Sequence, residues 1–255
     1  MLNKVLQRFS PIQKIPSYTG LAAIYDRMMD HVDYDEWTEH VVRLFEEYGA
    51  GGKRILEGGC GTGNVLLRLK KRGFRVAGFD SSFHMLRMAW ERVNVPLWQC
   101  DLGRISVSSR WDGILCLYDT IQYFSLDGFR RVLSEIYRVL EMRGVFVFDL
   151  ITESHAAKDW SDYTECDGGA DFEYVRRTWY ESRCCVLHTE FDICFSGNRK
   201  RYREYHRQHM YPLKDVERVI KESGFLVSAR LDGFTMNRAT EGSDRVHFVV
   251  RKEAA

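Results

Sequence analysis

Three glycines alternate with other residues at Gly59, Gly61 and Gly63, directly after a short apolar segment. Apolar residues recur at helical spacing after the loop, so the pattern predicts a strand, a glycine-rich turn and a helix. Such a turn gathers backbone N–H groups at the N-terminus of a helix, which suits a ligand with polar or anionic groups. The spacing is GxGxG, and Asn64 stands where the dinucleotide-binding pattern GxGxxG has its third glycine. The loop therefore predicts a nucleotide-like ligand without specifying which one.

Three acidic residues, Glu57, Asp80 and Asp101, stand at the ends of three successive apolar segments. Asp80 follows the glycines by about twenty residues, where a carboxylate can accept hydrogen bonds from ribose hydroxyls. Asp101 would lie near an adenine amino group, and Glu57 near a positively charged amino-acid portion. Taken singly, each aspartate is also explained as a turn or helix-capping residue. Taken together, the three acids favour a ligand with a ribose, an adenine and an amino-acid tail, which describes S-adenosylmethionine.

Alternating strand and helix patterns surround these motifs. The expected strands cover 54–57, 74–80, 96–101, 112–118 and 145–151, and the expected helices lie in 37–48, 65–69, 85–93 and 129–140. This alternation predicts an α/β protein with a parallel, doubly wound sheet. Ligands of such sheets bind beyond the carboxyl ends of the strands, at the switch in strand order. The site is therefore expected between the strands that end at Glu57 and at Tyr118.

The alternation stops after Leu150, and a small inserted antiparallel sheet is expected there. Three segments with strand character follow, at 172–180, 185–195 and 200–211. In the middle segment apolar residues alternate with polar ones such as His188, as in a strand with one buried face.

A helix at 213–220 and strands at 225–231 and 245–251 then return to the main sheet. The expected domains are an N-terminal cap segment (1–36), a main domain (37–151 and 212–255) and an inserted β lid (152–211).

Between Tyr18 and Arg251 the chain resembles the class I S-adenosylmethionine-dependent methyltransferases. The resemblance is carried by LEGGCGTG, AGFDSS, QCDL, WDGILCLYDTIQYF, YRVLEMRGVFVFDL and the closing strand pair. It implies a Rossmann-like seven-stranded sheet of order 3-2-1-4-5-7-6 with the last strand antiparallel. It also implies S-adenosyl-L-methionine as cofactor and S-adenosyl-L-homocysteine as product. AAIYDRMMDHVDYDEW and the inserted strands resemble the subgroup that methylates small molecules, including amino-sugar and amino-acid N-methyltransferases.

The resemblance also assigns residues to the site. For the cofactor it implies Tyr25, Trp37, Glu57, Gly59, Cys60, Gly61, Gly63, Asp80, Ser81, Met85, Cys100, Asp101, Leu102, Leu117, Tyr118 and Gln122. For the acceptor it implies Tyr18, Tyr25, Tyr118, Tyr123, His155 and His206. Tyr123 and His206 are the expected catalytic residues, because a neutral imidazole can accept a proton near neutral pH. Tyr25, Trp37 and Met85 are also consistent with plain core packing, and amino-sugar relatives often carry a histidine where Tyr123 stands.

Methyl transfer from a sulfonium is an in-line displacement with a neutral leaving group, so positioning dominates and no metal is expected. The chain lacks a (D/N)PPY loop, which argues against an adenine or cytosine amino methyltransferase. Asp149 is followed by Leu150 and not by Asn, which argues against a metal-dependent catechol-type enzyme. The chain contains no YxxxK motif, which argues against a short-chain dehydrogenase. A cofactor-binding protein without activity and an RNA or protein methyltransferase stay open as alternatives.

Charge balance and cysteine usage limit the cellular setting. Lys plus Arg number 37 and Asp plus Glu number 36, so no overall field draws the chain to nucleic acid or a membrane. The basic run 199–207 is interpreted as a solvated strand face. Seven cysteines without a CxxC pair, and no long apolar stretch, predict reduced thiols, a cytoplasmic protein and no membrane span. The expected partner is a small-molecule acceptor, and the expected state is a monomer or homodimer.

Overall fold

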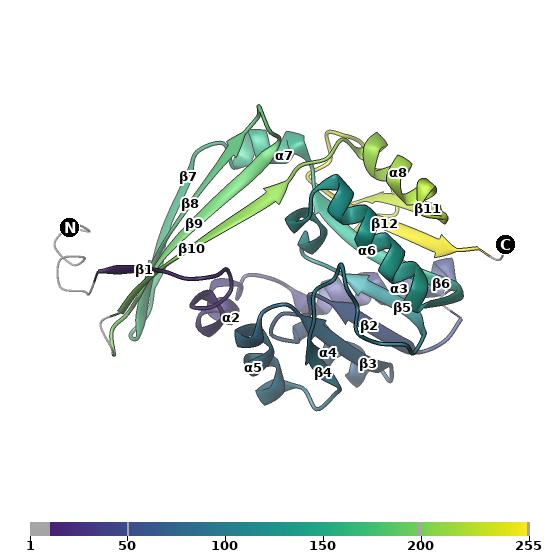
Figure 1. Cartoon of the computed structure of the whole chain (residues 1–255), viewed down its shortest axis with the longest axis horizontal. Coiled ribbons are helices and arrows are strands. Elements are labelled where there is room, and N and C mark those ends of the chain that lie inside the picture. Colours follow the sequence, from purple (N-terminus) through teal and green to yellow (C-terminus); the bar gives the residue numbers. More distant parts are fainter. Residues whose placement is uncertain (1–10, 50, 198–199, 254–255) are drawn as a thin grey trace.

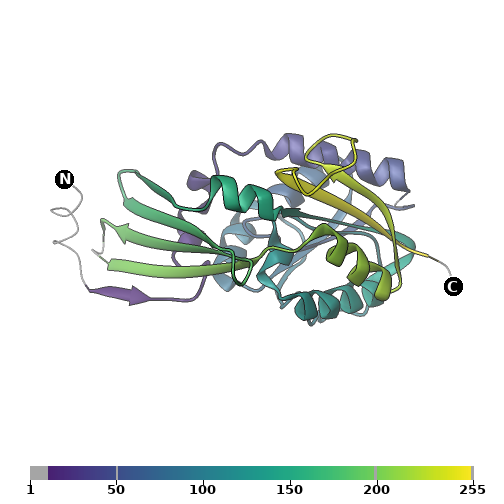
Figure 2. The same cartoon turned by 90° about the horizontal axis from the view of Figure 1, so that it is seen from above.

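The computed structural model describes residues 11–49, 51–197 and 200–253 and contains two β-sheets (Figure 1). The main sheet has seven strands and helices on both faces, and a five-stranded sheet, here called the lid sheet, extends away from it (Figures 1 and 2). Residues 1–10 of the expected cap segment and Arg199 of the basic run lie outside the described residues. Within the described ranges, no helix combines the length and the apolar character needed to cross a membrane.

The main sheet confirms the expected doubly wound α/β fold. Its strands are β2 (Arg54–Gly58), β3 (Arg75–Asp80), β4 (Leu97–Gln99), β5 (Trp111–Cys116), β6 (Leu140–Ile151), β11 (Phe225–Asp232) and β12 (Arg245–Lys252). They are ordered β4-β3-β2-β5-β6-β12-β11, and β12 is antiparallel to both of its neighbours. This is the expected order 3-2-1-4-5-7-6 with its antiparallel last strand.

Helices cover both faces of the main sheet (Figure 2). The helical elements are η2 (Leu21–Ala23), α2 (Tyr25–Met28), α3 (Tyr34–Tyr48), α4 (Asn64–Lys71), α5 (Phe83–Arg92), η3 (Thr120–Tyr123), α6 (Leu126–Val139), α7 (Glu153–Asp159) and α8 (Leu213–Glu222). Because strand side chains alternate between faces, Phe146 and Phe148 of β6 pack in one core with α6 and α8. Val145 and Val147 pack in the opposite core with α3 and α4. The carboxyl ends of the strands are left uncovered by both layers.

The lid sheet contains more strands than the sequence predicts. It consists of β1 (Ile12–Lys14), β10 (Lys200–His209), β9 (Val186–Phe195), β8 (Phe172–Glu181) and β7 (Tyr163–Gly168), in that spatial order. The antiparallel set β8, β9 and β10 is confirmed, whereas β7 and β1 were not predicted. β1 pairs in parallel with β10, so a segment near the start of the chain completes a sheet formed near residue 200.

The expectation of an exposed polar face on the middle strand is wrong. β9 is the central strand of the lid sheet, and His188 on its outer face is only 6% exposed. The rings of Trp179 and Tyr205, from the two neighbouring strands, stack on His188 at centroid distances of 5.2 and 5.8 Å. Large neighbouring side chains thus bury polar residues that an alternating pattern alone would expose.

The inner face of the lid sheet packs on the cap elements η2 and α2. One apolar cluster joins Leu21 and Ile24 of this region to Phe172, Phe191 and Ile193 of the lid strands. The cap and the lid sheet therefore share a core that is separate from the two cores of the main sheet.

Candidate active site

The glycine loop connects β2 to α4 and leaves the start of the helix open. Gly59, Gly61 and Gly63 have φ angles of 69°, 54° and 79°, a region that residues with a side chain rarely adopt. A Cβ atom on Gly61 would also lie 3.3 Å from Met85 Cε. Gly63 occupies the N-cap of α4 without a side-chain cap. The N–H groups at this helix end are therefore available to a ligand.

A cavity of about 290 Å³ lies beyond the carboxyl ends of β2, β3 and β5. It is located at the switch in strand order between β2 and β5, where the doubly wound fold predicts a ligand. The expected residues that line it are Tyr18, Tyr25, Glu57, Gly59, Cys60, Gly61, Asp80, Ser81, Met85, Cys100, Asp101, Leu102, Tyr118 and Tyr123. The structure thus brings most of the cofactor set and part of the acceptor set around one space.

Glu57 and Asp80 lie side by side on the cavity wall. Asp80 accepts hydrogen bonds from the backbone N–H groups of Gly61 (2.9 Å) and Ser82 (2.8 Å). Glu57 is 3% exposed, and its Oε2 atom finds no hydrogen-bond partner within the described residues. Burial, followed by the charge of Asp80, raises the pKa of Glu57 to about 8. Burial also raises the pKa of Asp80. The Leu66 backbone N–H donates to the Glu57 carboxyl, and the remaining Oε2 atom, without a partner among the described residues, fits a ligand that carries positive charge.

Asp101 lies at the far end of the cavity. It was expected to end a strand, but β4 stops at Gln99 and Asp101 is in the turn that follows. There its Oδ1 atom accepts a hydrogen bond from the N–H of Gly103 at 2.7 Å. The carboxylate is exposed and keeps acceptor capacity for a further donor.

Five tyrosine side chains, here called the tyrosine wall, also line the cavity. They are Tyr18, Tyr25, Tyr34, Tyr118 and Tyr123. Burial raises the pKa of each of these phenols above its ordinary value. Among the described lining residues none is Lys or Arg, although three are acidic. The cavity therefore has a negative and aromatic lining, which suits cationic groups.

His206 lies behind this wall and does not line the cavity itself. Its Nδ1 atom is 2.9 Å from the hydroxyl of Tyr123, and that hydroxyl is 2.7 Å from the hydroxyl of Tyr18. The two residues expected to be catalytic are thus in direct contact. His206 is separated from the cavity by Tyr123 and by Tyr18, whose ring lies 4.9 Å from the imidazole.

Several expected site residues lie outside the cavity lining. Gly63 and Leu117 are adjacent to lining residues in the chain, and Trp37 stacks on Tyr118 from behind at a centroid distance of 4.2 Å. His155 of α7 accepts a hydrogen bond from Trp160 Nε1 (3.0 Å) and is 2.9 Å from Asp159, so its polar atoms are directed toward these residues. Trp37 therefore supports the wall, and His155 stabilises the region around α7.

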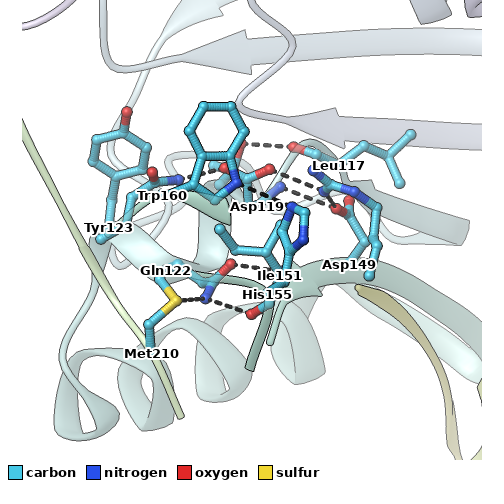
Figure 3. A network of polar contacts seen from close by, with 12 residues as sticks. Leu117, Asp119, Gln122, Tyr123, Asp149, Ile151, His155, Trp160 and Met210 are labelled. Carbon is cyan, nitrogen blue, oxygen red and sulfur yellow. Dashed lines mark hydrogen bonds and ion pairs between the residues drawn. The ribbon is translucent and has the colours of Figure 1, made fainter. Parts of the chain in front are cut away.

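Gln122 is fully buried and joins three segments (Figure 3). Its Oε1 atom accepts from the N–H of Ile151 (2.9 Å), and its Nε2 atom donates to the carbonyls of Ile151 and His209 (3.1 Å each). These bonds occupy the amide that was expected to contact the cofactor. Gln122 instead fixes the end of β6 and the end of β10 relative to η3.

A buried ion cluster, which the sequence did not predict, supports the turn after β5. Tyr118 and Asp119 have φ angles of 57° and 50°, which are unfavourable for residues with side chains. Arg245 of β12 forms ion pairs with Asp119 (2.9 Å) and with Asp149, which is fully buried. Burial raises the pKa of Asp149, and Arg245 opposes that rise. The cluster therefore stabilises the turn that presents Tyr118 to the cavity.

The remaining lining residues were not predicted. They are Ser17, Tyr34, Thr62, Asn64, Val65, Phe79, Thr120 and Phe124. Thr62 and Asn64 stand inside and just after the glycine loop, so their positions could have been inferred from the motif. Both donate to the Oδ1 atom of Asp26 in the cap, at 2.6 and 3.0 Å. This contact attaches the cap to the loop.

Comparisons with known proteins agree with this geometry. Residues 55–144 match the family model described as a methyltransferase domain. The structure is similar to that of an S-adenosylmethionine-dependent methyltransferase from Clostridium acetobutylicum, with a TM-score of 0.81, 20% identity, and coverage of 93% of this chain and 99% of the other. The family match and the shared fold support a class I S-adenosylmethionine-dependent methyltransferase. S-adenosylmethionine is accordingly the cofactor of this methyltransferase.

The chain is also similar to a homologue in sequence and to a second solved structure. The homologue YqeM of Bacillus subtilis (strain 168) is 28% identical over 243 residues, which cover 92% of this chain and 97% of YqeM. A sugar N-methyltransferase from Streptoalloteichus has a similar structure, with a TM-score of 0.75, 20% identity, and coverage of 90% of this chain and 93% of the other.

The described residues fit the cofactor of this methyltransferase. S-adenosylmethionine brings an ammonium and a sulfonium, and the unpaired Glu57 carboxyl and the tyrosine wall offer groups that stabilise positive charge. The open helix end and Asp80 offer donors and an acceptor for its remaining polar groups.

Proposed function

We propose that the methyltransferase transfers the S-adenosylmethionine methyl group to a nitrogen or oxygen atom of a small-molecule acceptor by in-line displacement. The observation that carries this proposal is that the cofactor residues and the tyrosine wall line one shared cavity of about 290 Å³. Because the cofactor itself takes up much of this volume, the remaining space suits a small acceptor. The similarity in structure to a sugar N-methyltransferase supports the same class.

In this proposal the chain's acids bind the cofactor. Glu57 accepts hydrogen bonds from the ammonium, Asp80 from the ribose hydroxyls, and Asp101 from the adenine amino group. Met85 and Leu102, both buried in the lining, pack on the faces of the adenine. The S-adenosylmethionine supplies an activated methyl group, so the protein contributes alignment and the removal of water.

The acceptor is held by the tyrosine wall under the cap and the lid sheet. Tyr18, Tyr25, Tyr118 and Tyr123 contribute hydroxyls and ring faces, and Tyr123 and His206 take up the proton that the acceptor releases. We also assign the enzyme to a reducing, cytoplasmic setting, because all seven cysteines are described and all are free thiols.

The decisive experiment is a search for metabolites that gain one methyl group. Cell extract is incubated with enzyme and S-adenosylmethionine carrying a deuterated methyl group, and small molecules that acquire the label are identified by mass spectrometry. Gly61→Val serves as the matched control, because a side chain at φ 54° and close to Met85 disrupts the loop without altering the lid sheet. Label in extracted RNA or protein and not in small molecules would contradict the proposal. So would label that appears equally with the Gly61→Val variant.

A further inference from the structure

Four side chains form a continuous path from the cavity into the lid sheet. Tyr18 and Tyr123 line the cavity, and their hydroxyl oxygens are 2.7 Å apart. Tyr123 contacts His206 Nδ1 at 2.9 Å, and His206 Nε2 is 3.5 Å from Glu204 Oε2. His206 is 3% exposed and Glu204 fully buried, so the path begins at the cavity and ends in the protein interior.

The direction of the hydrogen bonds along this path depends on the tautomer of His206. When the Nδ1 atom accepts from Tyr123, the proton of the neutral ring is on Nε2, which makes no hydrogen bond within the described residues and lies 3.5 Å from Glu204 Oε2. The Tyr123 oxygen then accepts from the Tyr18 hydroxyl, and a lone pair of the Tyr18 oxygen is free to accept from a molecule in the cavity. All bonds of the path are thus oriented away from the cavity, as proton removal requires.

Three backbone N–H groups near the cap hold the Glu204 carboxylate in place. Its carboxylate accepts hydrogen bonds from the backbone N–H groups of Tyr18 (2.6 Å), Gly20 (2.5 Å) and Leu21 (2.8 Å). The titratable side chains in contact with His206 are Tyr18 and Tyr123 from outside the lid sheet and Glu204 on its own strand, while Phe191 covers it from β9. Glu204 is therefore the group that can balance a positive charge on the imidazole.

Tyr18 and Tyr123 can pass a proton along the path, but neither side chain stays deprotonated. Burial raises the pKa of Tyr18 and of Tyr123 well above the ordinary value, so neither persists as a tyrosinate. A proton leaving the cavity is therefore passed on to His206, where it forms an ion pair with Glu204.

From this geometry we infer that Tyr18, Tyr123 and His206 form a proton relay that ends at Glu204, and that the acceptor is an amine without an acidic group. The inference rests on the proposed function. As the acceptor nitrogen forms its bond to the methyl carbon, the carbon–sulfur bond breaks and the sulfur keeps the electron pair. The nitrogen gives its proton to Tyr18 oxygen, Tyr18 gives its own to Tyr123, and Tyr123 gives its own to His206 Nδ1. The products are the methylated amine, S-adenosylhomocysteine and an imidazolium paired with Glu204.

The lining of the cavity determines the acceptor class. A carboxylate or phosphate on the acceptor would need a cationic partner, and none of the described lining residues is Lys or Arg. Glu57, Asp80 and Asp101 would repel it. An amine, in contrast, gains from acidic and aromatic surroundings as it approaches.

The relay is tested first without any acceptor. In histidine-¹⁵N-labelled enzyme bound to S-adenosylhomocysteine, the signal assigned with a His206→Gln variant should show a proton on Nε2 and a hydrogen-bonded, unprotonated Nδ1. Tyr123→Phe should abolish that hydrogen bond. The matched control is Tyr205→Phe on the outer face of β10, which removes a hydroxyl bonded to His188 Nδ1 and should leave the His206 signal unchanged. A proton on Nδ1 in the wild-type enzyme would overturn the relay.

The second test uses two matched pairs of probes, ethanolamine with glycine and glucosamine with glucose. We expect methylation of ethanolamine and glucosamine only. Tyr123→Phe should lower the rate by about 10²-fold or more, the range of general-base contributions, while Tyr205→Phe keeps it. Methylation of glycine as readily as ethanolamine, or of none of the four, overturns the acceptor class.

Glu204 is a positioning residue, and its role is separated from simple stabilisation by a pH profile. Glu204→Gln keeps the shape and loses the charge, so the acid limb of kcat/KM for the amine probe should move to lower pH. A lower rate with an unmoved acid limb would overturn the role of Glu204. Failure of the proposed function gives a different result from failure of the relay. If the proposed function is wrong, no small molecule in the extract acquires the label, and this outcome does not depend on the His206 signal.

Discussion

The environment of Glu57 favours binding of a cation. Its carboxyl is almost fully buried, and burial with the neighbouring Asp80 raises its pKa to about 8. In the unfolded chain a glutamate titrates near 4.3, so the folded state binds this proton more tightly than the unfolded state does. The contribution of Glu57 to stability is therefore lost progressively as the pH rises from about 4.3 through about 8.

Glu57→Gln should stabilise the ligand-free enzyme at high pH. At pH 8.5 the wild-type side chain is largely charged and buried with no cation beside it in the described residues, and the variant avoids that cost, which is on the order of a few kcal/mol. Near pH 5 the two proteins should unfold at nearly the same temperature. Thermal denaturation at both pH values measures the difference, and an equal Tm gain at pH 5 and pH 8.5 would contradict the assigned cause.

The same residue predicts proton release on cofactor binding. Near pH 7 the ligand-free Glu57 is largely protonated, and contact with the ammonium of S-adenosylmethionine favours the carboxylate. Calorimetric titration in buffers of different ionisation enthalpy should report release of a proton by the wild-type enzyme and a smaller release by Glu57→Gln. Equal release by both proteins would remove Glu57 from the cofactor site.

Asp80 should contribute to cofactor affinity through the ribose hydroxyls. Its two oxygens already accept from Gly61 and Ser82, and each retains capacity for another donor. Asp80→Ala should weaken binding of S-adenosylhomocysteine about tenfold or more, because unmatched hydroxyls cost about 1–3 kcal/mol. Isothermal titration measures the change, and circular dichroism checks that the variant is folded. Unchanged affinity in a folded variant would contradict the role.

At the scale of elements, Arg245 connects β12 to the turn after β5 and to the end of β6. Arg245→Met should destabilise the enzyme by about 3–5 kcal/mol at pH 8, because Asp149 becomes a buried charge without its partner. Near pH 5 the loss should be smaller, since a carboxyl with a raised pKa is then largely protonated. Denaturant unfolding of the single variants and of Arg245→Met with Asp149→Asn gives the coupling. A double variant no more stable than Arg245→Met would contradict it.

The helices and strands were largely predictable, because the spacing of apolar residues and the positions of turn residues indicate local structure. Alternation of strands and helices identified all seven strands of the main sheet, and the three glycines identified the loop. Arg245 was not identified because its partners, Asp119 in the turn after β5 and Asp149 in β6, come from distant parts of the sequence, and no local pattern indicates that pairing. The strand β1 was missed for the same reason, since its partner β10 follows it by almost the whole chain.

At the scale of the whole molecule, the fold could be predicted further than the site. Glu57, Asp80 and the glycine loop lie at strand ends, and strand ends converge in a doubly wound sheet whatever the side chains do. Gln122 and His155 were assigned to the site by resemblance, but the directions of their side chains depend on Ile151, His209, Trp160 and Asp159, which only the packed structure brings together. Glu204 was overlooked because it acts through backbone groups of the cap.

Tyr18 reaches both halves of the cavity at once. Its carbonyl accepts a hydrogen bond from Ser82 Oγ (2.9 Å), next to Asp80, and its hydroxyl belongs to the tyrosine wall. A segment that closes over the nucleoside therefore also finishes the pocket for the second substrate, which imposes a compulsory order on turnover. We expect S-adenosylmethionine to enter first and S-adenosylhomocysteine to leave last. In initial-rate studies, S-adenosylhomocysteine should then inhibit competitively toward S-adenosylmethionine and not competitively toward the acceptor. Competitive inhibition toward both substrates would indicate random entry.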